Sequence, residues 1–302
     1  MADLAVNLAG IKMENPVMSA SGTFGSGVEY DSVFDIGMMG ALVTTGLTLE
    51  SKVGNRPPRL CETPAGLLNA VGLQNPGVDV FIKDVLPEML DFGVPVIANI
   101  AGSTKDEFVE IAEKFSGTGV AGLEINISCP NVKTGGMALG TAPEVAAQVV
   151  GSVVESTDLP VIVKLTPNVT NIVELARAVA AAGADALSLI NTLLGMVIDV
   201  EQRKPMLGNV VGGLSGPAIR PVAVRAVWQV AQAVKIPIIG MGGICTGRDA
   251  LEFILAGASA VAVGSAFFND PLAAVRIIKE LDEYCGEHGV DRLQDLVGAV
   301  WK

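Results

Sequence analysis

The sequence predicts an α/β protein whose eight parallel strands and their helices close into one (β/α)8 TIM barrel, with an N-terminal hairpin and insertions at the C-terminal strand face. The first observation is that short apolar runs alternate with segments of helical periodicity along the chain. The second is a weak repeat of helix end, glycine turn, buried strand and polar tip, at 119–126, 182–191 and 256–265. No linker or low-complexity segment divides the chain, so we expect residues 1–302 to form a single domain.

The predicted strands are nearly continuous apolar runs, as expected of parallel strands that helices cover. They are Pro16–Ser19, Ala41–Thr45, Pro95–Ile100, Leu123–Ser128, Val161–Thr166, Ala186–Asn191, Pro237–Met241 and Ala260–Gly264. Capping-box patterns, Thr104 with Glu107 and Asn171 with Glu174, predict two helix starts. Asp270-Pro271 predicts a third, with Asp270 as N-cap and Pro271 at the first helical position.

Three segments are longer than a barrel connection requires. Residues 1–15 read as a small hairpin, Leu4–Leu8 and Ile11–Glu14, at the base of the barrel. Residues 46–93 and 192–236 follow the second and sixth predicted strands. Long insertions at the functional face of a barrel are usually binding loops, so we expect these two to help form a site.

Composition excludes several classes of function. The chain has 32 acidic and 20 basic residues and a formal charge of −12, which disfavours nucleic acid and anionic membranes as partners. It has no apolar stretch of 18 residues, and its N-terminal sequence lacks the features of a signal peptide, so we expect a cytoplasmic protein. The four cysteines form no C-x-x-C pair, so no metal site is predicted, and Cys61, Cys245 and Cys285 are interpreted as structural.

The segment 122–131 carries the strongest indication of chemistry. Along this strand Glu124, Asn126 and Ser128 point to one side, and the thiol of Cys129 follows at the strand's end. The chain has one histidine, near its C-terminus, so a proton carrier is expected to be Cys, Lys, Ser or a carboxylate. The alternative for Cys129 is a small buried apolar side chain.

Glycines end the seventh and eighth predicted strands, at 240–243 and 264–265. In a barrel, glycines there let backbone N–H groups approach a phosphate, helped by the N-terminus of the following helix. The alternative is that they are ordinary turn glycines.

Lys164 lies inside an apolar strand, where a lysine is costly unless it meets an anion or a polar ligand. Its interior position suits a charge directed at the N1/O2 edge of a flavin, while the alternative is a strand-end lysine that reaches solvent. Glu124 is expected to pair with Lys164 or another basic group. Five asparagines at strand tips and on loops predict an amide-rich pocket for a planar ring: Asn69, Asn99, Asn126, Asn131 and Asn191.

Several motifs together resemble the catalytic subunit of class 1B dihydroorotate dehydrogenases, over essentially the full length. They are Asn69-Ala-Val-Gly-Leu-Gln-Asn-Pro-Gly, Ile125-Asn-Ile-Ser-Cys-Pro-Asn-Val-Lys, Val163-Lys-Leu-Thr-Pro-Asn, Leu189-Ile-Asn-Thr, Gly212-Gly-Leu-Ser-Gly-Pro-Ala and Gly240-Met-Gly-Gly. The resemblance implies an FMN-dependent barrel of pyrimidine biosynthesis that oxidises dihydroorotate to orotate. It also implies a homodimer and a heterotetramer with a separate subunit that carries FAD and a 2Fe–2S cluster and passes electrons to NAD.

The resemblance also implies roles for individual residues. Cys129 is implied as the base that removes the C5 proton, while the C6 hydrogen goes as hydride to FMN N5. The residues implied to hold FMN are Ala20, Ser21, Thr45, Gly46, Asn99, Asn126, Lys164, Ile190, Gly216, Gly242, Gly243, Gly264 and Ser265. Those implied to hold the pyrimidine are Asn69, Ala70, Val71, Gly72, Leu73, Asn126, Asn191 and Thr192.

The chain departs from the family pattern at Thr45, where the family has a lysine that contacts the flavin and the substrate carboxylate. A charge-assisted hydrogen bond contributes about 1.5–3 kcal/mol, so orotate affinity falls at least about tenfold unless Lys52 or Arg56 compensates. Two other readings stay open. One is an FMN oxidoreductase acting on a related dihydropyrimidine or cyclic amide without the carboxylate; the other is a barrel that binds flavin or phosphate without catalysis.

Overall fold

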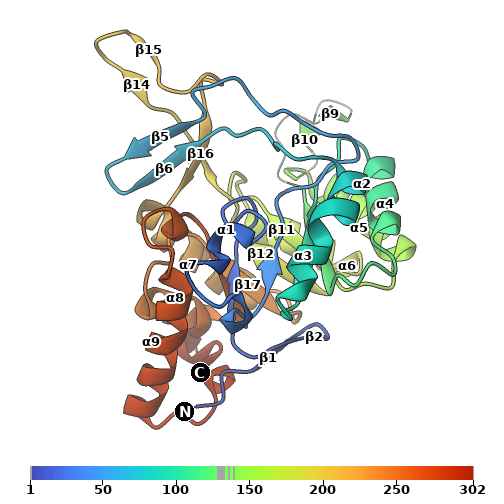
Figure 1. Ribbon diagram of the computed structural model, residues 1–302. Helices are drawn as coiled ribbons and strands as arrows, with labels where there is room; N and C mark the ends of the chain where they lie inside the picture. The colour runs from blue at the N-terminus through green and yellow to red at the C-terminus, as the bar shows by residue number, and fades with distance from the viewer. Residues whose placement is uncertain (1, 128–132, 135–136, 139, 302) are drawn as a thin grey trace.

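The barrel is present in the computed structural model, which describes residues 2–127, 133–134, 137–138 and 140–301 (Figure 1). Eight parallel strands form one sheet in the order β3-β18-β17-β12-β11-β8-β7-β4. The sheet closes between its edge strands, because the Ser19 N–H donates to the Ala41 carbonyl at 3.2 Å and Met18 bridges Ala41 in parallel. The strands are β3 (Val17–Ser19), β4 (Leu42–Val43), β7 (Val96–Ile100), β8 (Gly122–Asn126), β11 (Val161–Leu165), β12 (Ala186–Leu189), β17 (Ile238–Met241) and β18 (Ala260–Val263).

All eight strands fall where the sequence predicts them, but most end earlier at the pocket side. The polar tips of the predicted strands, such as Thr45, Thr166 and Asn191, lie just beyond the strand ends and line a cavity. The predicted fourth strand extends to Ser128, which lies outside the described residues.

Helices surround the barrel (Figure 1). They are α1 (Val28–Asp31), α2 (Val78–Val80), α3 (Leu86–Asp91), α4 (Lys105–Lys114), α5 (Pro143–Ser156), α6 (Ile172–Ala181), α7 (Arg220–Ala231), α8 (Gly247–Ala256) and α9 (Ala273–His288). Shorter helical turns are η1 (Ile36–Met38), η2 (Phe81–Val85, a π-helix), η3 (Pro217–Ile219), η4 (Ser265–Phe268), η5 (Leu293–Leu296) and η6 (Ala299–Trp301). No helix in these described ranges is both long and apolar enough to cross a membrane.

Two of the three predicted helix starts are confirmed. The side chains of Thr104 and Asn171 each accept a backbone N–H of the first turn, of α4 and α6 respectively. The third is wrong: α9 begins at Ala273 with Leu272 as N-cap. The Asp270 carboxylate accepts the Leu272 N–H at 3.0 Å and binds Arg276, so it closes a turn before the helix.

The predicted N-terminal hairpin is present as β1 (Val6–Leu8) paired antiparallel with β2 (Ile11–Met13). It lies near the end of the barrel that carries both chain termini (Figure 1). Its buried side chains, Val6, Leu8, Ile11 and Met13, join the apolar cluster that fills the lower barrel, which includes Ile97, Ile162 and Ile239. The hairpin therefore closes the base of the barrel.

The two long insertions combine into a second sheet that the sequence did not predict. Its order is β13-β16-β6-β5, and β16 runs antiparallel to β6 although Gly213 and Asn69 are far apart in sequence. These strands are β5 (Leu60–Thr63), β6 (Gly66–Asn69), β13 (Leu193–Gly195) and β16 (Gly212–Ser215). The β14 (Ile198–Asp199) and β15 (Lys204–Pro205) hairpin extends this sheet away from the barrel (Figure 1), and we call the six strands the arm. The remaining pair is β9 (Lys133–Thr134) with β10 (Met137–Ala138).

We predict that Leu8→Ala lowers the free energy of unfolding by about 2–5 kcal/mol, because Leu8 is fully buried and truncation leaves a cavity at the barrel base. Denaturant unfolding monitored by circular dichroism measures this. Lys12→Ala in the same hairpin is the matched control, since Lys12 is exposed. Equal effects of the two substitutions would contradict a packing role for the hairpin.

Candidate active site

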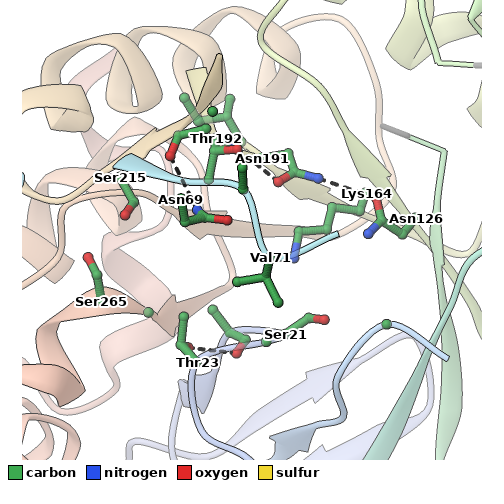
Figure 2. A pocket seen from close by; sticks show the side chains of 18 of the residues that line it. Ser21, Thr23, Asn69, Val71, Asn126, Lys164, Asn191, Thr192, Ser215 and Ser265 are labelled. Atoms are coloured by element: carbon green, nitrogen blue, oxygen red, sulfur yellow. Dashed lines mark hydrogen bonds between the residues drawn. The ribbon is translucent and has the colours of Figure 1, made fainter. Parts of the chain in front are cut away.

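A cavity of about 700 Å³ lies at the C-terminal ends of the barrel strands (Figure 2). Its lining comes from the segments that follow all eight strands and from β5, β6, β13 and β16 of the arm. Ligand pockets usually measure about 300–1,000 Å³, so this one can enclose a molecule larger than a single pyrimidine ring. The arm covers the side of the pocket that the barrel leaves open.

The structure brings together nearly all of the residues that the sequence assigned to ligands. The lining contains Ala20, Ser21, Thr45, Gly46, Asn69, Ala70, Val71, Gly72, Leu73, Asn126, Lys164, Ile190, Asn191, Thr192, Gly216, Gly242, Gly243, Gly264 and Ser265. Asn99 is different, because it is fully buried and does not line the cavity. Cys129 and Asn131 lie outside the described residues.

A buried polar cluster forms the floor of this pocket. Lys164 Nζ lies 3.5 Å from Glu124 Oε2, and the two side chains are 6% and 2% exposed. The Ser188 hydroxyl donates to Glu124 Oε1 at 2.7 Å, and Asn99 Nδ2 donates to Glu124 Oε2. The expected pairing of Glu124 with Lys164 is therefore confirmed, and Glu124 is committed to this cluster rather than exposed to a ligand.

Strand parity places this cluster inside the barrel. Ile162 belongs to the apolar cluster of the lower interior, and Lys164 is two residues further along β11, so both point inward. Val161 and Val163 point outward and join the core between sheet and helices. The interior thus changes from apolar at the base to charged at the pocket.

Amide side chains line one side of the cavity, as predicted (Figure 2). Asn191 Nδ2 donates to Asn126 Oδ1 at 3.3 Å, and Asn69 Nδ2 donates to the Gly213 carbonyl at 3.2 Å. The sequence assigned no role to Asn168, which also lines the cavity and donates to the Thr192 carbonyl at 2.9 Å. The sequence feature that could have indicated a role for Asn168 is the Thr166-Pro-Asn segment, which follows a strand as the assigned asparagines do.

Two lining segments adopt backbone conformations that restrict the residue type. Gly243 has φ +74°, and a Cβ there would lie 2.6 Å from the Gly216 carbonyl oxygen, so the glycine is required for close approach of the two loops. Leu73 has φ +57°, which is rare for a leucine. Such conformations concentrate at ligand sites, which agrees with the position of both residues in the lining.

The amides at the start of α8, which the sequence predicts to help hold a phosphate, have side-chain partners within the protein. The backbone N–H groups of Cys245 and Thr246 donate to the Asp249 carboxylate, both at 2.9 Å. The Gly247 N–H donates to Glu280 Oε2. These amides are therefore already bonded, whereas Gly242 and Gly243, which precede the helix, line the cavity.

The charge of the lining favours an anion. Among the described lining residues, Lys52 and Lys164 are the cations and none is an Asp or Glu, although the chain carries −12 overall. Arg56, the other candidate to replace a cation at Thr45, is exposed and outside the lining. Cys245, for which the sequence predicts no chemistry, lines the cavity, and burial together with Asp249 raises the pKa of its thiol.

The fold and the pocket define a TIM-barrel protein with a ligand site at the carboxyl ends of its strands. Residues 3–285 match the family model described as dihydroorotate dehydrogenase, and the chain belongs to this family of oxidoreductases. The resemblance drawn from the motifs is therefore confirmed.

Relatives with the same printed name, dihydroorotate dehydrogenase B (NAD(+)), catalytic subunit, match over nearly the full length. The protein of Desulforudis audaxviator (strain MP104C) is 60% identical over 297 residues, which cover 98% of this chain and 97% of the relative. That of Geobacter sp. (strain M21) is 56% identical over 299 residues, covering 99% and 98%. That of Geobacillus sp. (strain WCH70) is 54% identical over 303 residues, covering 100% and 97%.

We predict that Lys164→Met destabilises the protein by about 3–5 kcal/mol, because it leaves the Glu124 carboxylate buried without its counter-charge. Denaturant unfolding of the flavin-free protein measures this. Lys279→Met is the matched control, since Lys279 pairs with Glu283 at 3.4 Å on the surface and its loss has little effect. A Lys164→Met variant as stable as this control would show that Glu124 does not depend on Lys164.

Proposed function

We propose that this protein binds FMN and oxidises dihydroorotate to orotate in pyrimidine biosynthesis, passing the electrons to an NAD-linked partner subunit. The observation that carries this proposal is the near full-length similarity to relatives named as catalytic subunits of dihydroorotate dehydrogenase B (NAD(+)). The gathering of the implied ligand residues around one cavity supports it.

The chemistry of the pocket fits FMN. Asn99 Oδ1 is buried and has no hydrogen-bond partner within the described part of the chain. A Cβ at the lining residue Gly46 would lie 3.1 Å from this oxygen, so the acceptor is directly beneath the pocket surface. A flavin ring carries an N–H donor and carbonyl acceptors, which match this oxygen and the Lys164 ammonium. The glycines at 242, 243 and 264 and Ser265 suit the phosphate.

Bound FMN supplies the acceptor for the hydride that leaves C6 of dihydroorotate. The chain supplies the base: the Cys129 thiolate takes the C5 proton, so that one proton and one hydride leave and a C5=C6 double bond forms. Cys129 lies outside the described residues, but Ile127 and Gly140, which flank that segment, both line the pocket.

The pyrimidine ring is proposed to lie against the amide-rich wall. Asn69, Asn126 and Asn191 offer donors and acceptors at the positions that a cyclic imide needs. Thr192 lies at the same wall, where its hydroxyl would clash with any side chain at Gly213. The arm strand β16 therefore shapes this end of the pocket.

A partner chain is proposed to dock on the arm. Leu60, Leu194, Ile198 and Val200 are 54%, 58%, 55% and 76% exposed, and two of them also line the pocket mouth. Several large exposed apolar side chains on one sheet and its hairpin favour a protein interface. We infer that the homodimer and the heterotetramer with an FAD and 2Fe–2S subunit form at this face, and that the assembly is cytoplasmic.

Thr45 favours a second function, the oxidation or reduction of a dihydropyrimidine or cyclic amide without a carboxylate. This residue lines the pocket at the position where the family pattern has a lysine. A hydroxyl there removes one reason to prefer an anionic substrate.

We predict that dihydroorotate bleaches the visible spectrum of the bound flavin rapidly under anaerobic conditions. Dihydrouracil, which has the same ring without the carboxylate, is the matched substrate control and is expected to bleach it more slowly, by up to about fivefold if Lys52 alone recognises the carboxylate. If only dihydrouracil bleaches the flavin, or if dihydroorotate does so only in Thr45→Lys, the second function replaces the first.

We predict that Cys129→Ser slows flavin reduction by dihydroorotate about 100-fold or more, because a hydroxyl is a much weaker base than a thiolate. Stopped-flow absorbance in a single turnover measures the rate, and the flavin spectrum before mixing checks that FMN still binds. Cys245→Ser, in the same pocket, is the control and keeps the rate near that of the wild type. An unchanged rate in Cys129→Ser would sink the assignment of the base.

A further inference from the structure

An ion pair behind the pocket connects two of its glycine loops. Arg220 Nη1 donates to Asp249 Oδ1, and Asp249 Oδ2 accepts the N–H groups of Cys245 and Thr246. Arg220 is the first residue of α7 and follows the loop at Gly216, while Asp249 lies in the first turn of α8 and follows the loop at 242–243. Neither charged residue lines the cavity, but both loops do.

The packing between these loops leaves no room for adjustment. A Cβ at Gly243 would lie 2.6 Å from the Gly216 carbonyl oxygen and 2.9 Å from Arg220 Cβ. Gly242 and Gly243 have φ values of +125° and +74°, which a side chain would strain. Arg220 lies against Gly243, and Asp249 binds the N–H groups of Cys245 and Thr246 just after it, so the direction of the N–H groups in this loop depends on both charged residues.

The same pair controls the charge near the loop. Asp249 is 10% exposed and lies four residues after Cys245, which lines the cavity. A carboxylate so close to the loop repels an anionic ligand unless it is compensated. Arg220 provides that compensation, since its second carboxylate neighbour, Glu252 at 3.6 Å from Nε, is 49% exposed and screened by water.

We propose that Arg220 is a positioning residue for the phosphate of FMN. It fixes the loop at 242–243 through Asp249, and it cancels the Asp249 charge so that the loop accepts a dianion. This inference rests on the proposed function, because it takes FMN as the ligand. The proposed role of Arg220 concerns the phosphate alone. Riboflavin has the same ring without the phosphate, so a comparison of FMN binding with riboflavin binding distinguishes this role from a general role in folding.

The test is flavin binding by the full chain stripped of flavin, followed by the quenching of flavin fluorescence. Arg220→Met is expected to weaken FMN binding about tenfold or more, because an uncompensated carboxylate then lies behind the loop that accepts the phosphate. Riboflavin binding should change by no more than about twofold. Arg225→Met is the matched control, since Arg225 is an exposed arginine of the same helix, and it should leave both affinities unchanged.

Two further variants test the charge itself. Arg220→Met/Asp249→Asn removes both charges and should regain part of the lost FMN affinity, whereas Arg220→Lys keeps the charge and should retain most of the FMN preference. Arg220→Lys also provides the answer if Arg220→Met does not fold. Equal loss of FMN and riboflavin in Arg220→Met, or no loss of either, overturns the inference but leaves the proposed function intact. Failure of the wild-type chain to bind FMN overturns both.

Discussion

The site depends on the ion pair between Glu124 and Lys164 at the level where the barrel interior meets the pocket. Below it the interior is apolar, and Ile97 and Ile162 belong to the same buried cluster as the base hairpin. A lysine alone at this depth would cost several kcal/mol, since the desolvation of its ammonium would not be compensated. Ser188 and Asn99 donate to the Glu124 carboxylate, so strands β7, β8, β11 and β12 jointly set where the Lys164 charge enters the pocket.

A second constraint is that the two long insertions must meet before the pocket is complete. The wall that carries Asn69 belongs to β6, and β6 pairs with β16, which follows the sixth barrel strand. The pairing requires glycines, because a Cβ at Gly212 would lie 2.5 Å from the Asn69 carbonyl oxygen and one at Gly213 would overlap the Thr192 hydroxyl. The amide wall is thus a product of contacts between segments distant in sequence, which local patterns do not encode.

These two constraints explain how much the sequence could predict. Strand positions and the inward or outward direction of their side chains follow from local periodicity, so the pairing of Glu124 with Lys164 could be predicted. The depth of each side chain along the barrel axis could not be predicted, because neighbouring strands are staggered. Asn99 was grouped with Asn126 and Asn191 but is buried below them. The arm was missed because its strands are short and glycine-rich and pair over long distances. The sequence pattern misplaced the N-cap at Asp270 because aspartate favours turns as well as helix starts, and here it closes a turn. The role of Cys129 stays a prediction from its sequence context.

Lys52 is the second cation of the lining besides Lys164, and its position affects how the pocket would bind a substrate carboxylate. Thr45 is half-buried, whereas Lys52 lines the cavity from an exposed position. A charge at an exposed site is screened by water and salt, and its pairing contributes about 0–1 kcal/mol, less than the 1.5–3 kcal/mol of a buried charge-assisted hydrogen bond. Recognition of a carboxylate by Lys52 would therefore be weak and sensitive to ionic strength. Under the proposed function, selection of the substrate then depends chiefly on the ring amides, because an asparagine left unpaired by the wrong ring loses its hydrogen bonds inside the pocket.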